Sequence, residues 1–200
     1  MSAQRIRTTT AVITAVVALP LSLGAFVPQA FAVDAASSPT ATPSPFGPGC
    51  SMLPHHGRGS VRDMSRERVA MAAAHNPKLT KLALALRDAG LTGKLDHARH
   101  ITLFAPTNAA FDAMPKMKRV ELLRNREQLR KVLTYHVVDK TINPSQLPNG
   151  SFKTQEGSML KTSGSGTSFK VNDTAKIVCG DIRTANGTVY LVDRVLMPPS

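Results

Sequence analysis

After residue 60 the chain begins with a helical pattern of apolar and polar positions. Apolar residues recur every three or four positions, so that each segment can bury one face. Ser65 precedes an Ala-rich stretch and can cap it as a helix. Asn76 and Pro77 suit the cap and first turn of a further helix, whose apolar stripe ends at Gly90. The pattern therefore predicts two short helices between residues 61 and 90.

A short strand and further helices are predicted next. Residues 101–104 are mostly apolar and predict a strand, after which Thr107 or Asn108 can cap a helical turn. A short basic helix follows. Asn125 and Gln128 then have the spacing of a capping box for the last helix of this half.

From residue 149 onward the pattern changes to short strands. Asn149–Gly150 and Asn186–Gly187 are dipeptides typical of hairpin turns, and residues 164–167 are a Gly-rich loop between two strand patterns. Helices followed by a run of antiparallel strands predict an α+β fold, not the repeating strand–helix order of nucleotide-binding α/β proteins.

The beginning of the chain has the pattern of an export signal. Two arginines precede an apolar run over residues 11–27, and small residues at 30 and 32 suit a cleavage site. Pro20 interrupts the run, which makes it a poor transmembrane helix, and an uncleaved membrane anchor is the alternative. We expect three segments: a signal peptide over residues 1–32, a disordered Pro/Ala/Ser-rich arm over 33–60 and one folded domain over 61–199.

Charge and aromatic content limit the kind of partner. The chain has 25 Lys and Arg against 13 Asp and Glu, a formal net charge of +12, which favours anionic surfaces or polymers. Aromatic residues make up only 4% of the chain and Trp is absent. Because single-stranded nucleic acid is bound largely by aromatic stacking, and because the chain carries an export signal, we expect no nucleic-acid partner.

The two cysteines, Cys50 and Cys179, are candidates for a disulfide. In an oxidising compartment such a pair is more readily a disulfide than a metal or redox site. The bridge would close a loop of about 130 residues and stabilise the fold by about 5 kcal/mol in the chain-entropy model. Two unpaired thiols are the alternative.

The sequence contains no pattern that predicts catalysis. It has no Gly-x-Ser-x-Gly elbow, and its glycine-rich stretches lack the spacing of a phosphate-binding loop. His97 and His100 are spaced like two of the ligands of a metal site. Zinc needs three or four protein ligands, so we expect two solvated histidines. We expect no catalytic residue, no metal and no cofactor.

Three segments in the same order resemble the signatures of the fasciclin domain. They are residues 101–111 (strand, Pro exit and capped helix), 133–138 (with its central Tyr-His) and 189–199 (ending in Pro-Pro). The resemblance covers residues 61–199. Residues 47–50 and 178–180 also resemble the single-domain fasciclin antigens that mycobacteria secrete.

This resemblance implies a compact wedge of antiparallel strands packed with several short helices, used outside the cell for adhesion and without typical enzymatic activity. Tyr135 and His136 correspond to the contact residues proposed in animal members. The alternative is a half-buried pair hydrogen-bonded to a neighbouring loop. Asp181–Ile182, the only Asp-Ile pair, lies in the strand half, so an integrin is not the expected partner.

Basic residues gather in the two helices before Tyr135. The candidate patch is Lys116, Lys118, Arg119, Arg124, Arg126, Arg130 and Lys131. Only Glu121 and Glu127 oppose these seven charges, so the segment suits an anionic polymer. An ordinary solvated helix face is the alternative.

These observations together predict a secreted, non-enzymatic adhesion or binding module. We expect a monomer that binds a cell-surface protein or an anionic polysaccharide. Its association with a membrane or cell wall, if any, should be peripheral. One alternative is a basic wall-associated protein that binds anionic polymers by charge alone. The other is a secreted hydrolase, which would need a base and a nucleophile that the sequence does not identify.

Overall fold

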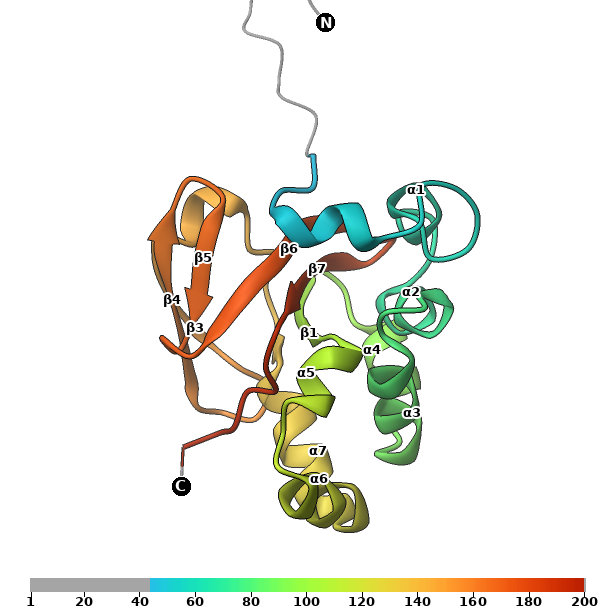
Figure 1. Ribbon diagram of the computed structural model, residues 1–200, viewed down its shortest axis with the longest axis vertical. Helices are drawn as coiled ribbons and strands as arrows, with labels where there is room; N and C mark the ends of the chain where they lie inside the picture. The colour runs from blue at the N-terminus through green and yellow to red at the C-terminus, as the bar shows by residue number, and fades with distance from the viewer. Residues whose placement is uncertain (1–43, 200) are drawn as a thin grey trace, which may run out of the picture. The chain divides into compact units, whose positions relative to one another are not determined.

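The computed structural model describes residues 44–199, which form an α+β domain (Figure 1). The signal peptide expected over residues 1–32 and the first part of the expected arm, through residue 43, lie outside the described residues. The helices are α1 (Val61–Met64), α2 (Val69–His75), α3 (Thr80–Asp88), α4 (Thr92–His97), α5 (Asn108–Asp112), α6 (Lys116–Arg124) and α7 (Arg126–Tyr135). The 3-10 turns are η1 (Pro48–Met52) and η2 (Pro144–Gln146).

Seven strands form one sheet in the order β2-β1-β7-β6-β5-β4-β3. They are β1 (Ile101–Pro106), β2 (Val137–Val138), β3 (Asn149–Lys153), β4 (Met159–Ser165), β5 (Ser168–Val171), β6 (Ala175–Arg183) and β7 (Gly187–Val192). The α+β prediction is confirmed, with one exception to the antiparallel pattern: β1 and β7 run parallel, with Leu103 opposite Val189. A parallel pair needs a long connection, and here five strands and three helices lie between the two partners.

The central strands β1 and β7 are buried on both faces. Leu103 and Val189 pack into a cluster with the apolar faces of α2, α3 and α4. Phe104 and Tyr190 point to the opposite face, where their stacked rings lie 5.6 Å apart and begin the second cluster. This division follows the two-residue period of a strand. In Figure 1, α2–α4 and β3–β5 accordingly lie on opposite sides of β1 and β7.

The folded domain begins earlier than the expected boundary at Val61. Phe46 forms an isolated bridge with Gly180 of β6, and its ring lies 5.5 Å from the ring of Phe169. Leu53 is also buried. The expectation of a disordered arm through residue 60 is therefore corrected for residues 46–60. The composition of this segment does not reveal its order, because its contacts are to strands far along the chain.

The Cys50–Cys179 disulfide is confirmed. It joins η1 to β6 across 129 positions of sequence, with the Cα atoms 4.8 Å apart. Cys179 is fully buried in the first cluster. The bond and the Phe46 bridge therefore hold the segment before α1 against the sheet.

The predicted helix caps are partly right. The Thr107 side chain accepts from the Ala110 amide at the start of α5, and the Asn125 side chain accepts from the Gln128 amide at the start of α7. Ser65 does not begin a helix but ends α1, which Ser60 caps. Asn76 is buried before α3 and accepts from the Lys78 amide, so α3 begins later than predicted, at Thr80.

One of the two predicted hairpin dipeptides forms a turn. Asn186 lies in the turn from β6 to β7, and Gly187 is the first residue of β7. Asn149–Gly150 instead opens strand β3, with Gly150 opposite Thr162 of β4. Added bulk at Gly150 would lie within 2.5 Å of side-chain atoms of Phe152 and Thr162, so close packing within the sheet explains this glycine.

Candidate functional site

Tyr135 joins the last turn of α7 to the strand half of the domain. Its side chain is 2% exposed. The hydroxyl donates to the Met159 carbonyl of β4 at 3.1 Å and accepts from the Asn172 side chain at 2.7 Å. Asn172 lies in the β5–β6 turn with a φ of 49°, a left-handed conformation that Asn tolerates better than most residues. Tyr135 thus fixes the orientation of α7 relative to β4 and the β5–β6 turn.

His136 joins α7 to the end of the described chain. The imidazole is fully buried; its Nδ1 lies 2.8 Å from the Val132 carbonyl, and its Nε2 lies 3.0 Å from the Leu196 amide. The carbonyl can only accept and the amide only donate, so the ring carries its proton on Nδ1 and is neutral. Burial lowers the pKa of His136 to about 4, although the Val132 carbonyl acts in the opposite direction.

Because both side chains are buried, neither Tyr135 nor His136 is presented to a partner in this structure. The structure therefore places both expected contact residues in the interior. The alternative, a pair satisfied by hydrogen bonds, matches the geometry, except that the pair is fully rather than half buried. Tyr135 and His136 lie at the end of α7, and their bonds position this helix, which lies at the surface.

The basic residues lie on α6 and α7, which are neighbours in the fold. Six of the seven are exposed: Lys116, Lys118, Arg124, Arg126, Arg130 and Lys131. Arg119 is partly buried and donates to the Phe111 carbonyl and the Asp112 carboxylate, each at 3.1 Å. Lys131 lies 3.7 Å from the Glu156 carboxylate. The structure therefore brings the predicted patch together on one pair of helices and leaves most of its charge facing solvent.

Exposed apolar side chains, which were not predicted from the sequence, accompany this charge. Met117 is 81% exposed and Leu123 is 47% exposed, both on α6. A hollow of about 680 Å³ is lined by residues of α6 and the start of α7, including Met117, Arg124 and Arg126. The sequence pattern that could have predicted them is in α6: its apolar residues do not fall on one face of the helix, and Leu122 alone is buried. We call the exposed residues of α6 and α7 the basic-apolar surface.

The two histidines with the spacing of metal ligands, His97 and His100, lie in different surroundings. His97 bonds through Nδ1 to the Gly93 carbonyl at 2.6 Å, and His100 is exposed at the start of β1. Within residues 44–199, no group of three or more His, Cys, Asp or Glu side chains is arranged to hold a metal ion. Over the same range, no helix has the length and apolar content needed to cross a bilayer.

Comparison with known proteins identifies the family. The sequence profile of the fasciclin domain matches residues 77–198. Immunogenic protein MPB70 of Mycobacterium bovis is 41% identical over 174 residues, which cover 83% of this chain and 89% of that protein. Cell surface glycolipoprotein MPB83 of Mycobacterium bovis is 40% identical over 162 residues, which cover 77% and 72%.

A solved structure agrees in fold. A FAS1 domain pair from the insect cell adhesion molecule Fasciclin I aligns with a TM-score of 0.50 and 19% identity, over 61% of this chain. The alignment covers 46% of that chain, so this protein spans about half its length. By the profile match and the two mycobacterial relatives, the chain belongs to the fasciclin domain family.

Proposed function

We propose that the protein acts outside the cell as a non-enzymatic adhesion module whose basic-apolar surface contacts an extracellular partner. Two relatives are named as an immunogenic protein and a cell surface glycolipoprotein, and the solved neighbour comes from a cell adhesion molecule. The Cys50–Cys179 disulfide supports an oxidising, extracellular compartment. The partner is a cell-surface protein or an anionic polysaccharide.

The combination of exposed charge and exposed apolar area on α6 carries this proposal. A single exposed apolar residue is common on a protein surface, but Met117, which is 81% exposed, lines the same hollow as two exposed arginines. Around Met117, the hollow shared with α7 offers a concave apolar contact edged by Arg124 and Arg126. Shape and charge together favour a specific partner over a general attraction to polyanions.

Tyr135 and His136 support this surface from the inside. Through these residues α7 is fixed to β4, to the β5–β6 turn and to the segment at Leu196. The position of α7, and with it the hollow beside α6, depends on these bonds. We assign the Tyr-His motif the role of holding the contact surface in place.

A hydrolase centred on His136 conflicts with this geometry. A general base must reach the proton that it abstracts, and both imidazole nitrogens face backbone groups in the interior. Its low pKa, about 4, also reflects exclusion from solvent. A binding role is consistent with both observations.

The competing function is attachment by charge alone. The strand half also exposes cations, among them Lys161, Lys170 and Lys176. If net charge were sufficient, charge reversal at either location would have the same effect. This provides a matched control, because three cations can be reversed on α7 or on the strands with the same change in net charge.

The test compares two triple variants on immobilised heparin, a sulfated polysaccharide, at increasing salt concentration. The helix variant carries Arg126→Glu, Arg130→Glu and Lys131→Glu, and the strand variant carries Lys161→Glu, Lys170→Glu and Lys176→Glu. We expect the helix variant to bind at least about tenfold more weakly than the strand variant, since only the former removes the local surface. Both should remain folded, because exposed charges contribute little to stability.

Equal losses in the two variants would contradict the proposal and support attachment by charge alone. Absence of heparin binding by the wild-type protein would exclude this class of polysaccharide as the partner. The same pair of variants would then be compared for capture of proteins from cell-surface extracts. Circular dichroism of both variants checks that the fold is unchanged.

A further inference from the structure

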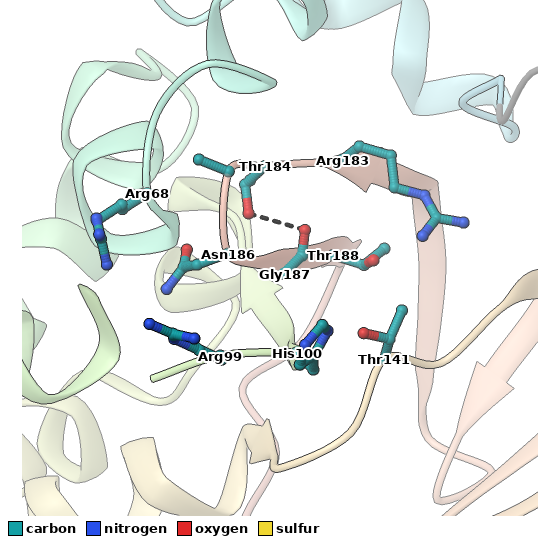
Figure 2. A pocket seen from close by; sticks show the side chains of 10 residues that line it. Arg68, Arg99, His100, Thr141, Arg183, Thr184, Asn186, Gly187 and Thr188 are labelled. Atoms are coloured by element: carbon teal, nitrogen blue, oxygen red, sulfur yellow. Dashed lines mark hydrogen bonds between the residues drawn. The ribbon is translucent and has the colours of Figure 1, made fainter. Parts of the chain in front are cut away.

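A second concave site lies at the β6–β7 turn, away from α6 and α7. Its volume is about 470 Å³. The side chains at its edge come from the start of α2, the start of β1, the loop before η2 and the turn itself (Figure 2). Its polar lining includes Arg68, Arg99, His100, Thr141, Arg183 and Thr188. Three arginines, one histidine and two threonines give this pocket an unusual density of hydrogen-bond donors.

The pocket is held open by a rigid turn. The Asn186 side chain accepts from the Val69 amide at 2.8 Å and donates to the Leu95 and Ala98 carbonyls at 2.8 and 2.9 Å. These bonds cap α2 from a distant part of the chain and fix the turn against α4. On the opposite side, the Thr102 hydroxyl donates to the Lys140 carbonyl at 2.6 Å and so fixes the loop that carries Thr141.

Within residues 44–199, two of the arginines form no ion pair with a carboxylate. Arg68 donates to the Asp96 backbone carbonyl, which is a neutral acceptor. Arg99 is exposed, and within residues 44–199 its side chain forms no hydrogen bond or ion pair. Arg183 differs, because its Nε lies 2.8 Å from the Asp181 carboxylate. Figure 2 shows Arg68 and Arg99 on one side of the turn and Arg183 on the other, so one end of the pocket holds the unbalanced positive charge.

The other end offers an unused hydroxyl. Thr188 is fully buried yet lines the pocket, and its Oγ1 has no hydrogen-bond partner in the described part of the chain. Thr188 lies between Thr102 and Arg183 in the sheet register. A buried hydroxyl without a partner costs stability, and a bound polar group would remove that cost. His100 completes the lining and has a left-handed φ of 57°, a conformation that His tolerates better than most residues.

We propose that this pocket binds an acidic sugar, with its oxyanion at Arg68 and Arg99 and its hydroxyl groups at Thr141 and Thr188. Guanidinium groups bind carboxylate, phosphate and sulfate through paired N–H donors. Threonine hydroxyls both donate and accept, as sugar hydroxyls require. The volume is within the usual range for small-molecule sites. The site shares no residue with the basic-apolar surface, so it stands or falls independently of the adhesion proposal.

The test is an NMR titration of the 15N-labelled protein at constant ionic strength. The probes are glucuronate, glucose 6-phosphate and glucose 6-sulfate, which separate the three oxyanions, with neutral glucose as the reference. At least one acid should give saturable shifts at the amides of His100 and the β6–β7 turn, and glucose should bind more weakly. If none of the three acids shifts these amides, or if glucose binds as well as the acids, the proposal is overturned.

Two variants locate the site. Arg99→Gln removes unbalanced charge from an exposed side chain and should weaken binding about tenfold, the effect of one charge-assisted hydrogen bond. Thr188→Val replaces the unpartnered hydroxyl by a methyl group of similar shape and should also weaken binding. Arg87→Gln, on the exposed face of α3, is the matched control and should have no effect. Equal weakening by Arg99→Gln and Arg87→Gln would show a general charge effect and overturn the proposal.

Discussion

His136 should make the protein lose stability as the pH falls below neutrality. Its imidazole is neutral and fully buried in the folded domain, with both nitrogens engaged by backbone groups. Protonation would add a second N–H at Nε2, directed at the Leu196 amide, which is itself a donor. The folded state therefore resists a proton that the unfolded chain accepts readily. Acidification is the perturbation, and His136→Gln is the variant that isolates it.

The magnitude follows from the two pKa values of this imidazole. Burial lowers the pKa of His136 from 6.5 to about 4 in the folded protein. Between these values the unfolded chain binds more protons than the folded one, so the free energy of unfolding rises with pH. The stabilisation is complete above pH 6.5 and is lost progressively toward pH 4. From pH 7 to pH 4.5 the loss amounts to about 2.5 kcal/mol.

Urea unfolding at a series of pH values measures this effect. At pH 7, His136→Gln should be less stable than wild type by about 1–3 kcal/mol, since it alters a buried hydrogen-bonded group. As the pH falls to 4.5, the wild type should lose about 2.5 kcal/mol more than the variant, so the difference between them should shrink or reverse. Carboxylates that titrate in this range are present in both proteins and cancel in the comparison.

His97→Gln serves as the control, because it makes the same substitution at an exposed histidine in place of a buried one. A difference between wild type and His136→Gln that stays constant from pH 7 to 4.5 would refute the reasoning. It would mean that the imidazole titrates alike in the folded and unfolded states, and hence that it is not buried as a neutral ring.

Two further predictions concern the connections between distant segments. Replacing Cys50 and Cys179 together by Ser should lower the free energy of unfolding by up to about 5 kcal/mol, measured by urea titration, because the unfolded chain regains its loop entropy; an unchanged midpoint would contradict this. Asn186→Ala should cost about 3 kcal/mol in the same assay, since it removes hydrogen bonds to Val69, Leu95 and Ala98. Stability within 1 kcal/mol of wild type would show that water replaces them.

The sequence determined the elements whose signals are local. The caps at Thr107 and Asn125 depend on a side chain and an amide three positions later, and both were predictable from residue type. The change from helices to strands near residue 149 was visible in the periodicity of apolar residues. Two cysteines in an exported chain predicted the disulfide, since an oxidising compartment favours the bond. The clustering of cations before Tyr135 was also predictable, because it requires only that two consecutive helices lie side by side.

Only the tertiary structure decided the features that depend on contacts between distant residues. Phe46 is ordered because it reaches Gly180 and Phe169, which no local pattern near residue 46 encodes. Tyr135 and His136 match a contact motif in sequence, yet hydrogen bonds to Asn172 and Leu196 hold them in the interior of the domain. The pocket at the β6–β7 turn likewise joins α2, β1 and β7, since chain folding alone brings them together. Residue type sets what a side chain can bind, whereas long-range packing determines which partners it meets and whether it reaches solvent.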